Sequence, residues 1–182
     1  MVCVQSSVHI EADPDAVFAL VTDVARKARL APHTHVLAVA QETEGPVRIG
    51  TVFHYRLVIE GRIADYRSRC TDFQPGRMME TESDSCPPFK VRVTVDPVPG
   101  GARLTQRETF VLPPVHVPLP GARGWLGTAL RILLGTSGAV VQDREAVARE
   151  EADMEARLQP RLDRWLASIK KHLERQRDRV EA

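Results

Sequence analysis

The stretch that decides the fold is VVQDREAVAREEADMEARLQPRLDRWLASIKKHL, residues Val140 to Leu173. Its apolar side chains recur at helical steps, and charged side chains fill most other positions. This spacing predicts one long helix over 140–178, kinked or restarted at Pro160, because proline lacks the amide hydrogen of an unbroken helix. The apolar positions are Val140, Val147, Met154, Leu158, Leu162, Trp165, Leu166, Ile169 and Leu173. Such a helix has to bury its apolar stripe against another layer.

Short alternating segments precede this helix and predict successive antiparallel strands. In the clearest of them, 51–60, apolar side chains occupy every second position, and a tight turn follows at Gly61-Arg62. Asp13 and Pro14 predict the start of a first short helix, and a second follows Asp23 and ends before Pro32. Strands are predicted over 2–11, 36–41, 51–60, 63–73, 77–82, 89–96 and 102–112. We therefore expect an α+β fold in which a curved antiparallel sheet of about seven strands wraps the long helix and leaves a cavity beside it.

Composition predicts one ordinary globular domain over residues 1–182, with 43% hydrophobic and 27% charged residues. A net charge of +1 removes any bulk electrostatic case for nucleic-acid binding. Cys3, Cys70 and Cys86 are odd in number and widely spaced, which favours reduced thiols over a disulfide framework or a zinc site. There is no export signal at the start, and the apolar segment 124–141 is interrupted by Arg131 and four glycines. We expect a soluble, cytoplasmic protein.

Four segments together carry a resemblance to a known family: 8–18, Asp23-Val24, 50–53 and 97–105, which read VHIEADPDAVF, DV, GTVF and PVPGGARLT. Their order and spacing resemble the START-related helix-grip superfamily, often labelled SRPBCC, and its bacterial polyketide cyclase/dehydrase-like branch. The resemblance implies a concave seven-stranded sheet wrapped around the C-terminal helix, with an apolar cavity. Relatives bind lipids, quinones, polyketides or plant hormones, and a minority catalyse cyclisation or aromatisation.

Two departures from that family pattern concern the segments after the second helix and before the last one. Members commonly have an aromatic pair where this chain has Leu30-Ala31-Pro32-His33, and the segment 113–138 is longer than the simplest members need. The fold inference survives both departures. A specific activity is not carried over, because fold alone does not define function.

The period of two along the strands selects candidate ligand-binding residues that would face the cavity. The polar ones are expected to orient a ligand within an otherwise apolar lining. The full set is Phe53, Tyr55, Leu57, Tyr66, Ser68, Gln106, Glu108, Phe110 and Trp165. The alternative is a β-bulge that turns one strand over, so that these side chains face solvent or pair across the sheet.

Glu108 is the one candidate for a catalytic residue. Parity with Leu104 and Phe110 places it inward, where desolvation would raise its pKa and make it a general acid or base. The alternative, which the sequence analysis favours, is a structural ion pair with Arg67 or Arg69. No metal site is expected, because His33, His35 and His116 lack carboxylate or cysteine partners at ligand spacing. No cofactor is expected, because the common nucleotide-binding and hydrolase motifs are absent.

Residues 113–138 contain a proline-rich loop and a short apolar helix candidate, Trp125 to Leu134. This helix could cover the cavity as a lid, lie on a membrane surface, form a dimer contact or simply pack on the sheet. The sequence predicts binding or carriage of a hydrophobic small molecule that is a lipid, quinone or polyketide-like compound. A polyketide aromatase/cyclase and a membrane-peripheral lipid or quinone chaperone are the alternatives. The oligomeric state stays open between monomer and homodimer.

Overall fold

The computed structural model describes residues 1–85, 87–110 and 144–180. The chain begins with β1 (Val2–Ile10) and two short helices, α1 (Pro14–Thr22) and α2 (Val24–Arg29). Six further strands and one long helix follow: β2 (Thr34–Gln41), β3 (Val52–Ile59), β4 (Arg62–Gln74), β5 (Met78–Ser83), β6 (Phe89–Val98), β7 (Gly101–Phe110) and α4 (Arg144–Val180). This order confirms the predicted helix-grip architecture, with element boundaries within a few residues of those expected.

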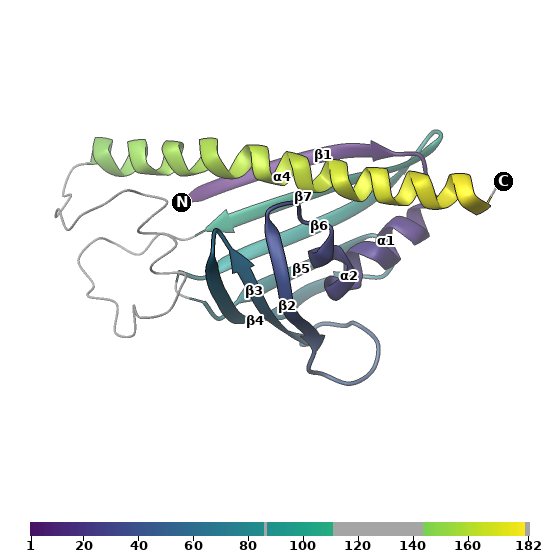
Figure 1. Ribbon diagram of the computed structural model, residues 1–182, viewed down its shortest axis with the longest axis horizontal. Helices are drawn as coiled ribbons and strands as arrows, with labels where there is room; N and C mark the ends of the chain where they lie inside the picture. Colours follow the sequence, from purple (N-terminus) through teal and green to yellow (C-terminus); the bar gives the residue numbers. More distant parts are fainter. Residues whose placement is uncertain (86, 111–143, 181–182) are drawn as a thin grey trace.

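All seven strands form one antiparallel sheet in the order β1-β7-β6-β5-β4-β3-β2. Figure 1 shows the sheet curling so that β2, β3 and β4 turn away from the plane of β1 and β7, while α4 runs along the β1 side. The first strand therefore pairs with the last one, from Val2 opposite Phe110 to Ile10 opposite Ala102. Strong curvature makes one face of the sheet concave, and that face holds the core.

The two short helices begin where the sequence predicts. The Asp13 carboxylate accepts a hydrogen bond of 2.7 Å from the Asp15 backbone N–H, and Pro14 is the first helical residue. The Asp23 carboxylate caps the second helix by accepting a bond of 3.0 Å from the Arg26 N–H. These caps satisfy amide groups that otherwise lack partners at a helix start.

Two local features differ from the expectation. The β3–β4 turn lies at Glu60 and Gly61, with φ angles of 52° and 76°, rather than at Gly61-Arg62. Ile59 pairs with Arg62 across this two-residue turn, and positive φ at both central positions is the geometry that suits a tight hairpin. Helix α4 continues through Pro160 without restarting, and a kink at this residue stays a prediction. Pro160 is exposed, so water can satisfy the carbonyl that loses its helical partner.

The predicted stripe of α4 packs into the main core together with α1 and the concave face of β1, β6 and β7. Its fully buried members are Met154, Leu162, Leu166, Ile169 and Leu173, and Leu158 and Trp165 are partly buried. Val140 lies outside the described residues. At the other end of the core, Gly101 approaches β1 so closely that a Cβ atom would stand 2.1 Å from the Ile10 carbonyl oxygen. Only glycine fits at that strand start.

Candidate functional site

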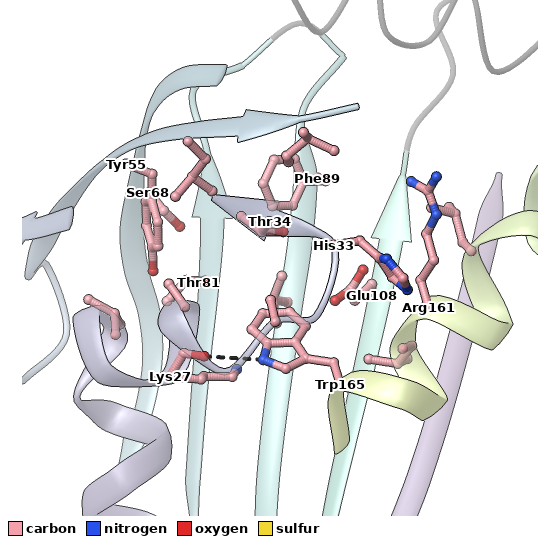
Figure 2. Close-up of a pocket in the computed structure, with 18 of the residues that line it drawn as sticks. Lys27, His33, Thr34, Tyr55, Ser68, Thr81, Phe89, Glu108, Arg161 and Trp165 are labelled. Carbon is pink, nitrogen blue, oxygen red and sulfur yellow. Dashed lines mark hydrogen bonds between the residues drawn. The ribbon is translucent and has the colours of Figure 1, made fainter. Parts of the chain in front are cut away.

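A cavity of about 280 Å³ lies between the concave face of the sheet, α2 and α4. Its lining is predominantly apolar, with a few polar side chains that come from separate elements. Helix α4 contributes Met154, Leu158, Arg161, Leu162 and Trp165, and α2 contributes Val24, Lys27 and Ala28. Figure 2 shows that the strands form the opposite wall. Mostly apolar walls with a small number of polar groups are the usual form of a small-molecule site.

Four aromatic rings form a continuous row along the sheet side of this cavity. Tyr55 of β3 is directly opposite Tyr66 of β4, and their rings stack with centres 5.0 Å apart at 8°. Tyr66 then meets Phe89 of β6 edge to face at 5.3 Å, and Phe89 meets Phe110 of β7 at 5.6 Å. All four line the cavity. The row offers ring faces and edges to a ligand from β3 across to β7, a width of five strands of which β5 contributes no ring.

Most of the predicted binding residues lie together at this cavity. Those that line it are Tyr55, Leu57, Tyr66, Ser68, Glu108, Phe110 and Trp165. Phe53 and Gln106 share the concave face, but they are fully buried and are not part of the lining. The register shift of β4 falls between Cys70 and Asp72, beyond the cavity-facing part of the strand, so Tyr66 and Ser68 keep their inward orientation. Their role in binding a ligand stays a prediction.

Glu108 lies on the cavity wall, half-buried, and accepts a hydrogen bond of 2.6 Å from the Gln106 side-chain amide. Desolvation raises the pKa of its carboxyl, while the Gln106 hydrogen bond and the positive charge of Lys27 oppose that rise. The predicted ion pair with Arg67 or Arg69 is wrong. Arg67 pairs with Glu42 at 2.9 Å, and Arg69 donates to the Gly50 carbonyl oxygen, because both arginines lie on the exposed face of β4, away from the cavity.

Lys27, like Thr34, Thr81 and Arg161, is a polar cavity residue that sequence reasoning missed. Only 7% of it is exposed, and its ammonium lies 5.1 Å from the centre of the Trp165 ring. The Trp165 indole N–H also donates to the Lys27 backbone carbonyl oxygen (Figure 2). Burial lowers the pKa of Lys27 to about 8, and the negative charge of Glu108 limits the fall. The sequence does contain a signal for the burial of Lys27. Lys27 lies on the same helical face as Val24 and Ala28, at i, i+3 and i+4 spacing, and all three residues are buried.

One edge of the cavity is formed by the α2–β2 connection and the β3–β4 turn. His33 and Thr34 line it there, whereas His35 does not. Arg161 of α4 forms an ion pair with Glu60 of the turn, so this pair joins the sheet to the helix beside the cavity. Within residues 1–85, 87–110 and 144–180, no group of three His, Cys, Asp or Glu side chains is placed to hold a metal ion.

Several predictions concern parts of the chain outside the described residues. These are the loop and the short helix of 113–138, including Trp125 to Leu134, and also His116 and Cys86. Cys3 and Cys70 are free thiols. Among the helices that the structure describes, none has the length and apolar character needed to cross a membrane.

Solved structures with the same architecture include three bacterial proteins. Zhui aromatase/cyclase from Streptomyces sp. R1128 is 19% identical, with a TM-score of 0.64 over 96% of this chain and 94% of that chain. A polyketide cyclase-like protein from Corynebacterium glutamicum is 22% identical, with a TM-score of 0.56 over 94% and 91%. A protein from Thermus thermophilus is 14% identical, with a TM-score of 0.59 over 94% and 96%. At these identities the likeness shows a shared fold.

Comparison with curated protein sequences gives no match. The family described as polyketide cyclase/dehydrase and lipid transport matches residues 1–142, which include the first strand, both short helices and the rest of the sheet. Since this match spans well over half of the sequence, the chain belongs to the polyketide cyclase/dehydrase and lipid transport family.

Proposed function

We propose that this protein binds a hydrophobic small molecule with a flat, unsaturated or aromatic part, of quinone or polyketide-like character, in the cavity between sheet and α4. The observation that carries the proposal is the row of Tyr55, Tyr66, Phe89 and Phe110 on one cavity wall, with Trp165 contributed from α4. Aromatic pairs gain more than area burial alone provides, so a planar ligand is favoured over a flexible chain of equal size.

The size and polarity of the cavity further restrict the class of ligand that it can bind. A volume of about 280 Å³ is at the low end of pockets for drug-sized molecules, which argues for a compact ligand rather than a two-chain lipid. The Ser68 hydroxyl, the Glu108 carboxyl and the Lys27 amine are among the polar groups of the lining that could orient such a ligand, and the others are His33, Thr34, Tyr55, Tyr66, Thr81 and Arg161. The membrane-peripheral alternative depends on residues 125–134, which lie outside the described part of the chain.

The test is binding of the apolar fluorophore N-phenyl-1-naphthylamine, together with native mass spectrometry of the purified protein for a co-purifying hydrophobic molecule. Val91→Phe adds a ring to the cavity wall and should weaken fluorophore binding by occupying the space. Arg103→Phe adds the same ring to the outer face of β7 and should leave binding unchanged. Equal binding by the wild type and both variants would refute the proposed site.

A second candidate function is catalysis of the aromatase/cyclase kind, and one observation favours it. Lys27 and Glu108 line the same cavity, and desolvation moves the pKa of each toward neutrality, from above for the amine and from below for the carboxyl. Paired groups of this kind can move protons on a poly-ketone. If Glu108 is the acid or base, Glu108→Gln should retain ligand affinity yet lower turnover of a model poly-ketone by about 10²–10⁴.

A further inference from the structure

We propose that Lys27 is a nucleophilic amine that captures the carbonyl group of a flat hydrophobic aldehyde or ketone as a Schiff base inside the cavity. The inference rests on the proposed function, since the carbonyl compound has to enter the cavity first. It is carried by the placement of the amine, which is buried on the cavity wall, lies over the Trp165 ring and shares the lining with Glu108.

Lys27 differs in its surroundings from every other lysine of the chain. Lys90 is exposed and pairs with Glu82, and Lys171 is exposed. Lys170 donates to the Glu174 carboxylate and to the His9 carbonyl oxygen. Among the residues that the structure describes, no carboxylate lies within ion-pairing distance of the Lys27 ammonium. Its one close partner is an indole ring, which leaves the amine available to a ligand.

The protonation state of Lys27 also supports its role as a nucleophile. Burial lowers the pKa of Lys27 to about 8, so near neutral pH a useful fraction of the side chain is the free amine that attacks carbonyl carbon. Exposed lysines, with pKa values near 10.4, are almost fully protonated at that pH. The charged or titratable side chains that share the cavity with Lys27, apart from the two tyrosines, are Glu108 of β7, Arg161 of α4 and His33 after α2. Tyr55 and Tyr66 stay neutral, because burial raises the pKa of both phenols.

The reaction needs no group beyond those present. The free amine of Lys27 adds to the carbonyl carbon, the carbonyl π electrons move to oxygen, and proton transfer from nitrogen to that oxygen gives a neutral carbinolamine. The carbon–oxygen bond then breaks, and the hydroxyl group leaves as water after taking a proton from the Glu108 carboxyl in its protonated form, which desolvation favours. The products are an iminium on Lys27, a Glu108 carboxylate and one water, so atoms and charge balance.

The cavity also stabilises the iminium product of this reaction. The iminium carries its positive charge at the nitrogen that lies over the Trp165 ring, where the cation–π attraction persists after the proton of the free ammonium is gone. The newly formed Glu108 carboxylate supplies a counter-charge within the same low-polarity space. The aromatic row of the opposite wall favours carbonyl compounds that carry an aryl or other planar group.

The experiment uses 2-naphthaldehyde as the probe and cyanoborohydride to reduce the Schiff base to a stable secondary amine. Intact mass spectrometry and peptide mapping should find one adduct per chain, at Lys27. Lys27→Arg keeps the cation over Trp165 but cannot form the imine, and should lower adduct formation by about tenfold or more, because guanidinium stays protonated. Lys171→Arg removes an exposed lysine as the matched control and should leave the yield unchanged. The rate of labelling at Lys27 should rise as pH approaches 8, where the amine loses its proton.

A carbonyl-free analogue, 2-naphthalenemethanol, separates this inference from the proposed function. Binding of the analogue by the wild type, with an adduct at Lys27 in the wild type and none in folded Lys27→Arg, supports both proposals. Binding of the analogue with adducts spread over Lys90, Lys170 and Lys171 overturns the Schiff base and leaves the binding function standing. Absence of analogue binding in the folded wild type overturns both. Thermal unfolding followed by circular dichroism verifies the fold of Lys27→Arg, and Lys27→Met serves as the second variant if arginine does not fit.

Discussion

The indole N–H of Trp165 donates a hydrogen bond of 3.1 Å to the backbone carbonyl oxygen of Lys27. The same indole ring lies 5.1 Å from the Lys27 ammonium, so one side chain of α4 holds both the backbone and the charged end of one residue of α2. This contact lies on the cavity wall and joins two elements that are far apart in sequence. The position of the amine is therefore determined by the packing of α4 rather than by α2 alone.

Trp165→Phe removes the indole donor and keeps an aromatic ring. We expect the free energy of unfolding to fall by about 0.5–1.5 kcal/mol, the usual net contribution of one hydrogen bond. The value should lie at the low end, because the Lys27 carbonyl oxygen also accepts a bond from the Leu30 N–H and keeps that partner. Urea unfolding measures the change. A loss well above this range would mean that the phenyl ring fails to pack in the indole site.

Lys27→Met should stabilise the protein at pH 7. In the folded protein the pKa of Lys27 is about 8 rather than 10.5, so burying the ammonium costs on the order of 3 kcal/mol below pH 8, less the cation–π attraction that the variant also loses. Between pH 8 and 10.5 the unfolded chain binds more protons than the folded one, so wild-type stability rises with pH and the advantage of the variant shrinks.

Chemical unfolding of both proteins across this pH range checks the prediction. Lys171→Met is the control, because Lys171 is exposed, and its effect should stay within about 0.5 kcal/mol and be independent of pH in this window. A constant difference between wild type and Lys27→Met would show that the amine is not desolvated in the folded protein.

Leu162→Ala tests the grip of the sheet on α4. Leu162 is 3% exposed and belongs to the main core, so the truncation should lower the free energy of unfolding by about 2–5 kcal/mol. Arg157→Ala, at an exposed position on the same helix, should change it by less than about 0.5 kcal/mol. Equal stability of Leu162→Ala and the wild type would contradict burial of the α4 stripe.

Glu60→Gln should speed exchange of ligand without altering the fold. The Glu60–Arg161 ion pair connects the β3–β4 turn to α4 beside the cavity, and exposed ion pairs contribute about 0.2–1 kcal/mol. Stopped-flow release of N-phenyl-1-naphthylamine should accelerate by about 1.4-fold to fivefold, the rate factor that corresponds to this energy. Glu82→Gln breaks an exposed pair with Lys90 on the outer face and should leave the release rate unchanged.

The fold could be predicted because two periodicities agree along the chain. Steps of three and four residues mark the face of α4 that the core buries, and steps of two mark the concave face of strands such as β3. The exceptions are local. The β3–β4 turn includes Glu60 in a positive-φ conformation, which side chains rarely adopt, so composition pointed to the next pair of residues instead. Pro160 interrupts the hydrogen bonding of α4, but its exposed position makes that interruption tolerable.

The cavity wall on the strands was predictable from the same alternation, whereas the contribution of α2 was not. Strand parity places Tyr55, Tyr66 and Glu108 on the lining, and it also shows why Arg67 cannot reach Glu108 from the other face of β4. The sequence analysis did not identify Lys27 as a cavity residue, because lysine is rarely buried and α2 is otherwise rich in exposed arginine. Lys27 is buried because α4 packs against α2. A local sequence pattern does not indicate how two segments so far apart in the chain are placed relative to one another.

The pairing of β1 with β7 bears on how the chain folds as it is synthesised. Val2 has its partner in Phe110, and the helix that covers the finished concave face emerges later still. Until then the nascent chain presents part of the surface around Val4 and Leu104 to water or to a chaperone, since the α4 residues that complete this core are not yet made. Contacts of such large sequence separation slow folding, because the chain has to close long loops before it gains the stabilising pairings. Synthesis on the ribosome thus delays completion of this core until its last helix arrives.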